Sequence, residues 1–269
     1  MAIKADLIHG RGGGGHDRGL LSVSENEQLP RGWAGGFARS FTIQGSWSYL
    51  YMIGSGFAFA LRPLLRGSGR DDVDAVSRRH LERFNAHPYL ASIALGAVAR
   101  MESEDVDPQT IHRFKEAIQG SLGGLGDTLV WGAWRPATLL FALMVAAAGA
   151  PPWVPVLLFL VLYNAGHVAL RWWGFKMGLD EGRDVATRLG RAELPRLAER
   201  VLAAATLLLG LLVGVLLVGK LPNVGMQWFW PLGGGVSFVI GLRFGRPVLR
   251  AATMALILTI IVVSAMGGI

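Results

Sequence analysis

Residues 136–170 read PATLLFALMVAAAGAPPWVPVLLFLVLYNAGHVAL and contain no Lys, Arg, Asp or Glu. A bilayer core is about 30 Å thick and takes roughly 20 helical residues to cross, so this stretch is too long for one crossing. Pro151, Pro152 and Pro155 lie near its middle, where proline stops or turns a helix. We therefore predict a tight hairpin of two apolar helices at 137–150 and 154–170. The first is short, and is either re-entrant or tilted.

Three further stretches, 201–219, 221–242 and 251–269, also lack charged residues other than histidine. Residues 201–218 would form roughly 27 Å of helix at about 1.5 Å per residue, enough for one crossing. A shorter span at 228–242 is loosened by three consecutive glycines, and 248–266 completes the set. The predicted class is an all-α integral membrane protein, with a C-terminal bundle of roughly 4–5 apolar helices in 136–269, one or more short or re-entrant.

The composition agrees with a membrane protein. Of 269 residues, 52 % are apolar and only 17 % are charged, against about 25 % in a typical soluble domain. So many apolar residues exclude a disordered chain. The absence of cysteine excludes a disulfide scaffold, a thiolate zinc site and a cysteine nucleophile.

The net charge of +7 is unevenly distributed. Residues 1–135 carry 15 basic and 14 acidic side chains, whereas 136–269 carry 11 and 5. Two predicted loops, 171–200 and 243–250, are rich in arginine, and the loop between them, 219–227, has only Lys220. The positive-inside rule therefore places both basic loops and the N-terminal half in the cytoplasm and the C-terminus outside. This topology explains the basic pI better than nucleic-acid binding, because the surplus arginines flank apolar spans.

The N-terminal half is predicted to contain cytoplasm-facing amphipathic or re-entrant helices at 36–135, after a flexible tail at 1–35 that lacks the apolar region of a signal peptide. Residues 40–65 include Trp47, Tyr49 and Tyr51, which suit a helix lying on the membrane interface, although a buried core helix is the alternative. Further helices are predicted at 72–85 and 91–101. Asp107-Pro108 begins another, whose apolar face consists of Ile111, Phe114, Ile118, Leu122 and Leu125.

Residues 120–126 read GSLGGLG, and each glycine costs a helix about 1 kcal/mol relative to alanine. We predict a backbone break at this point, next to Asp127 and at the entrance to the membrane, where unwound N–H and C=O groups would line a cavity. The alternative is close helix packing, with Asp127 as an N-cap. The glycines concerned are Gly120, Gly123, Gly124 and Gly126.

No self-contained catalytic or metal site is visible. His80, His87 and His112 lack metal-ligand spacing, and no G-x-S-x-G nucleophile elbow is present. Asn164 and His167 share one face of an apolar helix, so they are either a functional pair or interface residues. We therefore expect neither a metal nor a cofactor, and no enzymatic activity from the isolated chain.

Three motifs, taken together, resemble the IID component of the mannose/fructose/sorbose family of the bacterial phosphotransferase system (PTS). They are FTIQGSWSY at 41–49, RHLERFNAHP at 79–88 and the segment 120–136, which contains GDTLVWG at 126–132. Glu102 and Lys115 also fall where this family has similar residues. The resemblance covers roughly residues 36–218. Ser121, Gly123 and Ala86 depart from the usual Pro, Ala and Thr.

The resemblance implies a subunit of the bacterial inner membrane. Such a subunit pairs with a IIC membrane protein, often as a trimer of pairs, to translocate a hexose-type sugar that IIA and IIB phosphorylate. A scaffold or regulatory subunit without transport is the alternative. By motif match, the residues expected near the sugar path or the IIC contact are Asn85, His87, Asp127, Thr128 and Trp131. Asn and Asp suit sugar hydroxyls and Trp suits a pyranose face, although Asn85 and His87 could equally cap a helix before Pro88.

Overall fold

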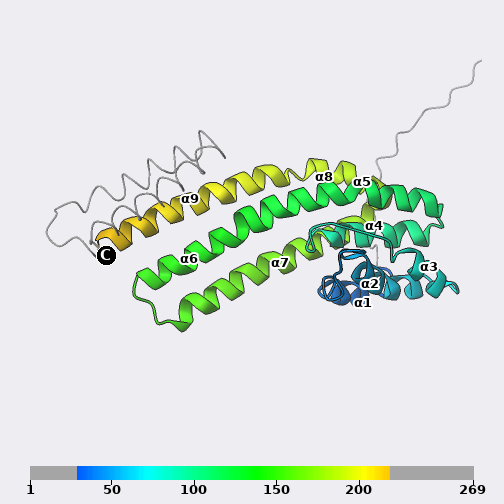
Figure 1. The fold of residues 1–269 in the computed structure, drawn as a ribbon, viewed down its shortest axis with the longest axis horizontal. Coiled ribbons are helices and arrows are strands. Elements are labelled where there is room, and N and C mark those ends of the chain that lie inside the picture. The colour runs from blue at the N-terminus through cyan, green and yellow to red at the C-terminus, as the bar shows by residue number, and fades with distance from the viewer. Residues whose placement is uncertain (1–28, 219–269) are drawn as a thin grey trace, which may run out of the picture.

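The computed structural model describes residues 29–218, so the predicted spans at 228–242 and 248–266 and most of the predicted tail lie outside the described residues. The described part consists of helices and turns, with two isolated β-bridges, and the predicted all-α class is confirmed (Figure 1). The first helix, α1 (Trp33–Ser40), already begins inside the region predicted as tail.

The predicted hairpin is present, and it consists of α6 (Arg135–Ala147) and α7 (Trp153–Glu181). The turn between them contains the Pro151-Pro152 pair, as the sequence predicts. α6 alone is short, as predicted, but it is the last part of a longer helical run. It continues, without a gap, from α5 (Pro108–Gly126) through a π-helix, η1 (Asp127–Trp134). The helical runs Pro108–Ala147 and Trp153–Arg191 are both long and apolar enough to cross a membrane.

The basic segment 171–200 is largely helical, so its prediction as a loop is wrong. α7 continues to Glu181, and is followed by a short 3-10 helix, η2 (Gly182–Asp184), then α8 (Val185–Arg191) and α9 (Leu194–Val218). Arginine is a good helix former, so the point where charges begin marks a change of surroundings and not the end of a helix. α9 then runs along α6 (Figure 1).

The region 40–65 is two elements and not one helix. α1 ends at Ser40, turns occupy 41–53, and α2 (Gly54–Gly67) contains Pro63 in its interior. Proline has no N–H to bond the carbonyl four residues earlier, which here belongs to Phe59. The Arg39 guanidinium donates to that carbonyl instead, at 3.3 Å. A side chain from α1 thus satisfies the carbonyl group that Pro63 leaves without a backbone hydrogen bond in α2.

The next helix is shorter than the predicted 72–85, since α3 is Val73–Arg79. Residues beyond it leave the helix because Phe84 pairs with the turn before α2. The Phe84 N–H donates to the Tyr51 carbonyl at 3.2 Å, and the Ile53 N–H donates to the Phe84 carbonyl at 3.1 Å. This pairing brings the second motif of the sequence beside the first.

α4 (Ala91–Ser103) is buried along most of its length and lies against the C-terminal part of α7. The two backbones are in contact, because a Cβ on Gly96 would overlap the Phe175 carbonyl and one on Gly178 would overlap the Ile93 carbonyl. Glycine permits this close approach of two helices, as small residues do in membrane proteins. The hairpin and the N-terminal half are therefore joined through a glycine seam.

The predicted break at Gly120, Gly123, Gly124 and Gly126 is wrong, because all four residues lie within α5. Asp127 is not an N-cap either, since the helical run passes through it. An unwound segment leaves backbone groups unsatisfied, at several kcal/mol each in apolar surroundings. Keeping glycine in a helix costs only about 1 kcal/mol per residue. The departure from α-helical geometry instead follows the glycines, in η1.

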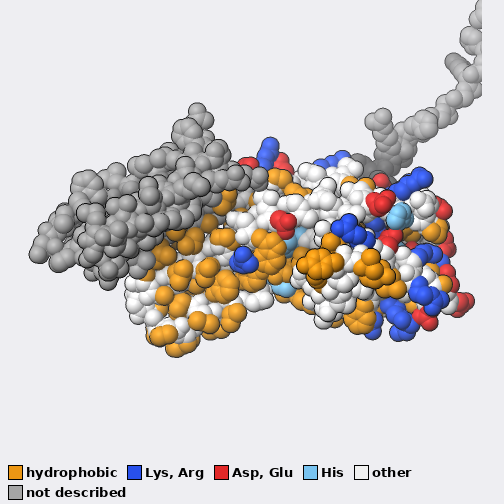
Figure 2. Space-filling model, in the orientation of Figure 1, with side chains coloured by type: hydrophobic (Ala, Val, Ile, Leu, Met, Phe, Trp, Pro, Cys, Tyr) orange, Lys and Arg blue, Asp and Glu red, His pale blue; other side chains and the backbone are white. Residues whose placement is uncertain are grey.

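The other features predicted for α5 are confirmed. Asp107 is its N-cap, and its carboxylate accepts a bond of 3.0 Å from the Thr110 N–H. Along the predicted apolar face, Ile111, Ile118 and Leu122 are buried. Figure 2 shows the result for the molecule: apolar side chains gather over α6 and α7, and charged side chains gather at the opposite end of the long axis.

Candidate functional site

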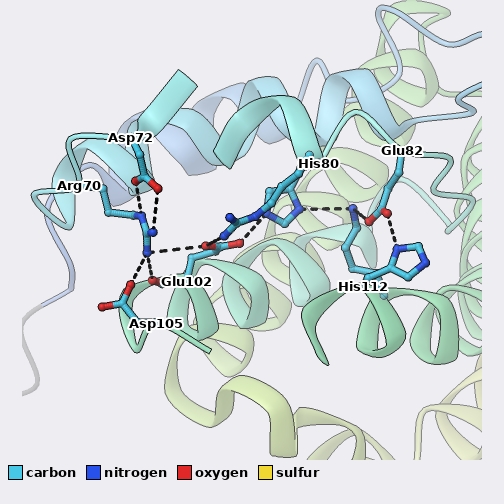
Figure 3. A network of polar contacts seen from close by, with 9 residues as sticks. Arg70, Asp72, His80, Glu82, Glu102, Asp105 and His112 are labelled. Atoms are coloured by element: carbon cyan, nitrogen blue, oxygen red, sulfur yellow. Dashed lines mark hydrogen bonds and ion pairs between the residues drawn. The ribbon is translucent and has the colours of Figure 1, made fainter. Parts of the chain in front are cut away.

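A buried polar network joins α3, α4 and α5 (Figure 3). At its centre is Glu102, whose side chain is fully buried. One Glu102 carboxylate oxygen lies 2.8 Å from His80 Nε2, and the other accepts from Arg79. Arg70 donates to the Glu102 backbone carbonyl at 2.8 Å and to Asp105 at 2.6 Å. A carboxylate at the end of α4 thus holds two arginines and a histidine that precede it in the chain.

The second half of the network surrounds Lys115 of α5, which is also buried. Its Nζ lies 2.6 Å from Glu82 Oε1 and 3.5 Å from His80 Nδ1. Because an ammonium group only donates, Nδ1 of His80 accepts, and the ring proton lies on Nε2, where it is donated to Glu102. Glu82 is also bonded by His112. His80 therefore links the ion pair between Glu102 and Arg79 to the ion pair between Glu82 and Lys115.

The electrostatics of this network favour a neutral His80 and ionised carboxylates. Burial lowers the pKa of His80 below its usual value, even though the hydrogen bond to Glu102 acts in the opposite direction. Burial alone would raise the pKa of Glu102, but the hydrogen bonds from His80 and Arg79 outweigh it, and the pKa is lowered. The same balance, with Lys115 as the main partner, lowers the pKa of Glu82. The network is a structural clamp, because every member is engaged within the chain.

A second cluster forms where His87 meets η1. Its Nδ1 accepts from the Tyr89 N–H at 3.2 Å, and its buried Nε2 has no hydrogen-bond partner among residues 29–218. The His87 ring lies 5.2 Å from the ring of Trp131. A Cβ on Gly126 would overlap the His87 side chain. The glycine therefore makes the space in which the histidine sits.

Burial, and then the positive charge of nearby Arg171, lower the pKa of His87 to about 4. The ring is therefore neutral at physiological pH. With Nδ1 as the acceptor, the proton lies on Nε2, which is left as a buried donor. Few buried donors in proteins lack a partner, and such groups are found at functional sites.

The π-helix presents Trp131 to this cluster. The Arg135 N–H donates to the Val130 carbonyl, five residues back, which is the pattern of a π-helix. Trp131 is half-buried between His87, Tyr89 at 5.8 Å and the Arg135 guanidinium at 4.8 Å. π-helical segments inside α-helices are rare and frequently occur at functional sites. Here the segment coincides with most of the GDTLVWG motif.

Tyr89, Tyr163 and Arg171, which the sequence analysis did not single out as site residues, complete the cluster together with His167, which it did. Tyr89 Oη lies 2.8 Å from Tyr163 Oη, and the Tyr89 ring stacks on His167 at 3.8 Å. Buried Arg171 donates to His167 Nε2 at 3.2 Å and to the Ser40 carbonyl. Polar residues at 163, 167 and 171 follow a helical period, and that signal could have found them. Asn164 does not join, since its amide bonds the Leu160 carbonyl of its own helix.

The structure brings some of the predicted site residues together and leaves others apart. His87, Gly126 and Trp131 are in contact, whereas the Asp127 side chain is exposed. The Thr128 hydroxyl donates to the Gly124 carbonyl at 2.8 Å, within its own helical run. The Asn85 side chain is exposed too, and its N–H donates to Gln119 of α5 at 2.8 Å.

The exposed residues lie beside an open face of α5. Nothing lies within 4 Å of the positions that a Cβ would take on Gly120 and Gly124, whereas one on Gly123 would lie 4.0 Å from the Asn85 carbonyl. Among residues 29–218, no group of His, Asp and Glu side chains is placed to hold a metal ion. The cluster can therefore offer hydrogen bonds, aromatic faces and a smooth helix surface.

Known proteins are similar to this chain in both sequence and fold. The family described as "PTS system mannose/fructose/sorbose family IID component" matches residues 34–233. The mannose-specific EIID component of Escherichia coli K12 is 32 % identical over 200 residues, which cover 71 % of this chain and 68 % of that one. The fructose permease IID component of Bacillus subtilis is 29 % identical over 187 residues, 66 % of each chain.

Two solved structures share the fold of this chain. A chain in the cryoEM structure of the mannose transporter ManYZ with microcin E492 is 25 % identical, with a TM-score of 0.53, over 90 % of this chain and 97 % of that one. Another, described as a membrane protein, has a TM-score of 0.59 at 23 % identity, over 88 % and 95 %. The matched segment contains all three motifs and both clusters, and the chain belongs to the IID components of the mannose/fructose/sorbose family of the PTS, as a membrane subunit of a sugar permease.

Proposed function

We propose that this subunit pairs with a IIC membrane protein in trimers of pairs and that each pair translocates a hexose-type sugar, which IIA and IIB phosphorylate. The specificities of the two relatives described above support this proposal, because they are named for mannose and fructose. The chain would lie in the bacterial inner membrane, with its charged end and N-terminus in the cytoplasm and its C-terminus outside. The isolated subunit would have no enzymatic activity.

The observation that carries the site proposal is the contact between His87 and η1. Two family motifs, RHLERFNAHP and GDTLVWG, meet there through Gly126 and Trp131. The faces of Trp131 are already approached by His87, Tyr89 and Arg135, so the role that we propose for Trp131 and His87 is to position the π-helix. The exposed side chains of Asp127 and Asn85 would then contact a sugar hydroxyl or a group of IIC. Thr128 is partly buried and would lie at the edge of this contact.

The open face at Gly120 and Gly124 supports a contact with IIC in the same region. Small residues let a second helix approach closely in a membrane, where packing and not water exclusion drives association. Asp127 lies at the end of this face, so one surface would hold the partner while the adjacent carboxylate faces the path of the sugar.

The test uses the intact IIC–IID complex, carrying Asp127→Asn or His87→Ala. We expect hexose uptake that depends on the phosphate donor to fall several-fold in both variants, while IIC still co-purifies at equal stoichiometry. Asp180→Asn, which changes an exposed acid of α7 that pairs with Lys176, is the control and should transport normally.

Normal transport by both variants would show that the site is wrongly assigned. Loss of IIC from the Asp127→Asn complex would identify this carboxylate as a partner contact and not a sugar contact. A wild-type complex that assembles but takes up no hexose would instead support a scaffold or regulatory subunit.

A further inference from the structure

The segment 41–52 between α1 and α2, here called the aromatic loop, presents large apolar side chains to its surroundings. It contains no charged residue, although charges are frequent elsewhere in the N-terminal half. Tyr49 is 84 % exposed and Leu50 is 68 % exposed, and Phe41, Trp47 and Tyr51 are each more than two-fifths exposed. A contiguous group of exposed aromatic side chains indicates a surface that is covered by something other than water.

The aromatic loop has a defined conformation that holds these rings outward. Ile43 is buried, and its carbonyl lies against Gly56 of α2, where a Cβ would overlap it. Ser48 and Met52 exchange two backbone hydrogen bonds, of 2.7 and 3.3 Å. Trp47 and Tyr49 pack edge to face, 4.8 Å apart. The rings are therefore exposed by the fold of the loop and not by disorder in it.

The start of the aromatic loop is fixed to one level of α7. The Phe41 ring lies 5.5 Å from His167 and 4.9 Å from the Arg171 guanidinium, and Arg171 also donates to the Ser40 carbonyl. Arg171 is the first charged residue after the charge-free stretch of α7. The loop thus begins where the surroundings of α7 change from apolar to polar.

The other end of that stretch carries its own exposed ring. Trp153, the first residue of α7, is 66 % exposed. From Trp153 to Arg171 the helix rises roughly 27 Å at about 1.5 Å per residue, which is close to the thickness of a hydrocarbon core of about 30 Å. The helix face between them exposes apolar side chains: Val156, Leu157, Leu160, Val161 and Val168. Exposed aromatic residues therefore bracket one membrane thickness of apolar surface.

We propose that the aromatic loop lies in the lipid headgroup layer of one leaflet and that Trp153 marks the headgroup layer of the other. Trp and Tyr favour this layer because an apolar ring and a polar N–H or O–H are satisfied there at once. Gln44, Ser46 and Ser48 lie between the rings in sequence and supply polar groups of the kind that headgroups and interfacial water bond.

Lipid fits the aromatic loop better than a protein partner does, because the loop continues the apolar band of α7. In Figure 2, apolar side chains over the α1–α2 region lie beside the band over α6 and α7, and the charged end begins beyond them. This order of apolar, aromatic and charged surface along one axis is that of a protein crossing a membrane interface. The inference does not depend on the sugar or on the site proposed above.

The chain has no cysteine, so a single introduced cysteine can be labelled with a nitroxide before the subunit is combined with IIC, without a background from this chain. Three full-length variants, purified with IIC and placed in lipid nanodiscs, are compared: Tyr49→Cys in the aromatic loop, Val161→Cys on the apolar face of α7, and Asp71→Cys at the charged end. The measurement is the ratio of collision rates with oxygen, which enriches in lipid, and with a water-soluble nickel complex. We expect the ratio of oxygen to nickel collision rates to be highest for Val161→Cys and lowest for Asp71→Cys. The ratio for Tyr49→Cys should lie between them, several-fold above that for Asp71→Cys.

Each other result overturns the proposal. A ratio at 49 equal to that at 71 would place the loop in water, and one equal to that at 161 would place it within the hydrocarbon. Low collision rates with both agents at 49 would show that IIC covers the loop. As a second measurement, Trp47→Cys should give the same intermediate ratio as Tyr49→Cys.

Discussion

At the scale of single residues, the most constrained group is the Glu102 carboxylate, which is fully buried between His80 and Arg79. Removing one partner of a buried ion pair leaves an uncompensated charge, and typically costs about 3 to 5 kcal/mol. Glu102→Gln should therefore strongly lower the thermal stability of the purified complex. Glu104→Gln removes an exposed carboxylate paired with Arg100, and should change stability by about 1 kcal/mol or less. Equal melting temperatures for the two variants would contradict the clamp.

The two buried histidines predict a pH dependence. Burial lowers the pKa of His80 and, to about 4, that of His87, whereas both would titrate near 6.5 in the unfolded chain. Below about pH 6.5 the unfolded state therefore binds more protons than the folded state, and stability falls as the pH falls. The melting temperature should decrease between neutral pH and about pH 5, a range in which carboxylates stay ionised.

The variant His87→Phe isolates one of these contributions, because it keeps an aromatic ring and removes the titration. Its melting temperature should fall less steeply over the same pH range than that of the wild type. An unchanged slope would show that His87 is accessible to protons in the folded state.

The motifs of the sequence contain residues that the structure joins, but they do not show how those residues pair. Arg79, His80 and Lys115 stand in motif positions, and the structure joins all three in one network. Glu102 pairs with Arg79 and His80, and Glu82 pairs with Lys115. In each pair the two residues are more than twenty positions apart in the chain, so only tertiary folding reveals the pairs. His87 and Trp131 were both selected by motif, but their contact depends on the space at Gly126.

At the scale of elements, the hairpin α6–α7 was predictable because charge-free length and a proline pair act locally. The turns at 41–53 were not, since aromatic residues at mixed spacing suit a helix and a turn equally. The break at Gly120 to Gly126 was wrong because glycine propensity was weighed without the larger cost of unsatisfied backbone groups. Pro63 is tolerated inside α2 for a related reason, because Arg39 of a different element donates to the carbonyl that proline cannot bond.

The contact between His87 and Gly126 of α5 can be tested with a matched pair of variants. Gly126→Ala places a methyl group where the His87 side chain lies, so it should destabilise the complex by about 1 to 3 kcal/mol, as overpacking does. Gly190→Ala, in α8, meets open space and should stabilise that helix by up to about 1 kcal/mol. Thermal unfolding of both complexes distinguishes them. Equal stability would mean that His87 is not seated against Gly126.

At the scale of the whole molecule, the long axis is polarised. The hairpin turn after α6 forms one apolar end, and α3 with the start of α5 forms the charged end (Figures 1 and 2). A bilayer accommodates this arrangement only when its plane crosses the long axis, because the charged end would otherwise enter hydrocarbon. The sequence predicted this polarity from charge counts, whereas the positions of the helices beside one another required the fold.

From that polarity, the positive-inside rule predicts an orientation with the charged end in the cytoplasm and the hairpin turn outside. Asp71→Cys and Ala148→Cys place a single thiol at exposed positions of the two ends. On intact cells, a maleimide that cannot cross the membrane should label residue 148 and spare residue 71, and inverted membrane vesicles should give the reverse. Labelling of residue 71 on intact cells would mean the opposite orientation. Labelling of both positions from one side would mean that the hairpin does not cross, because its two ends would then share a compartment.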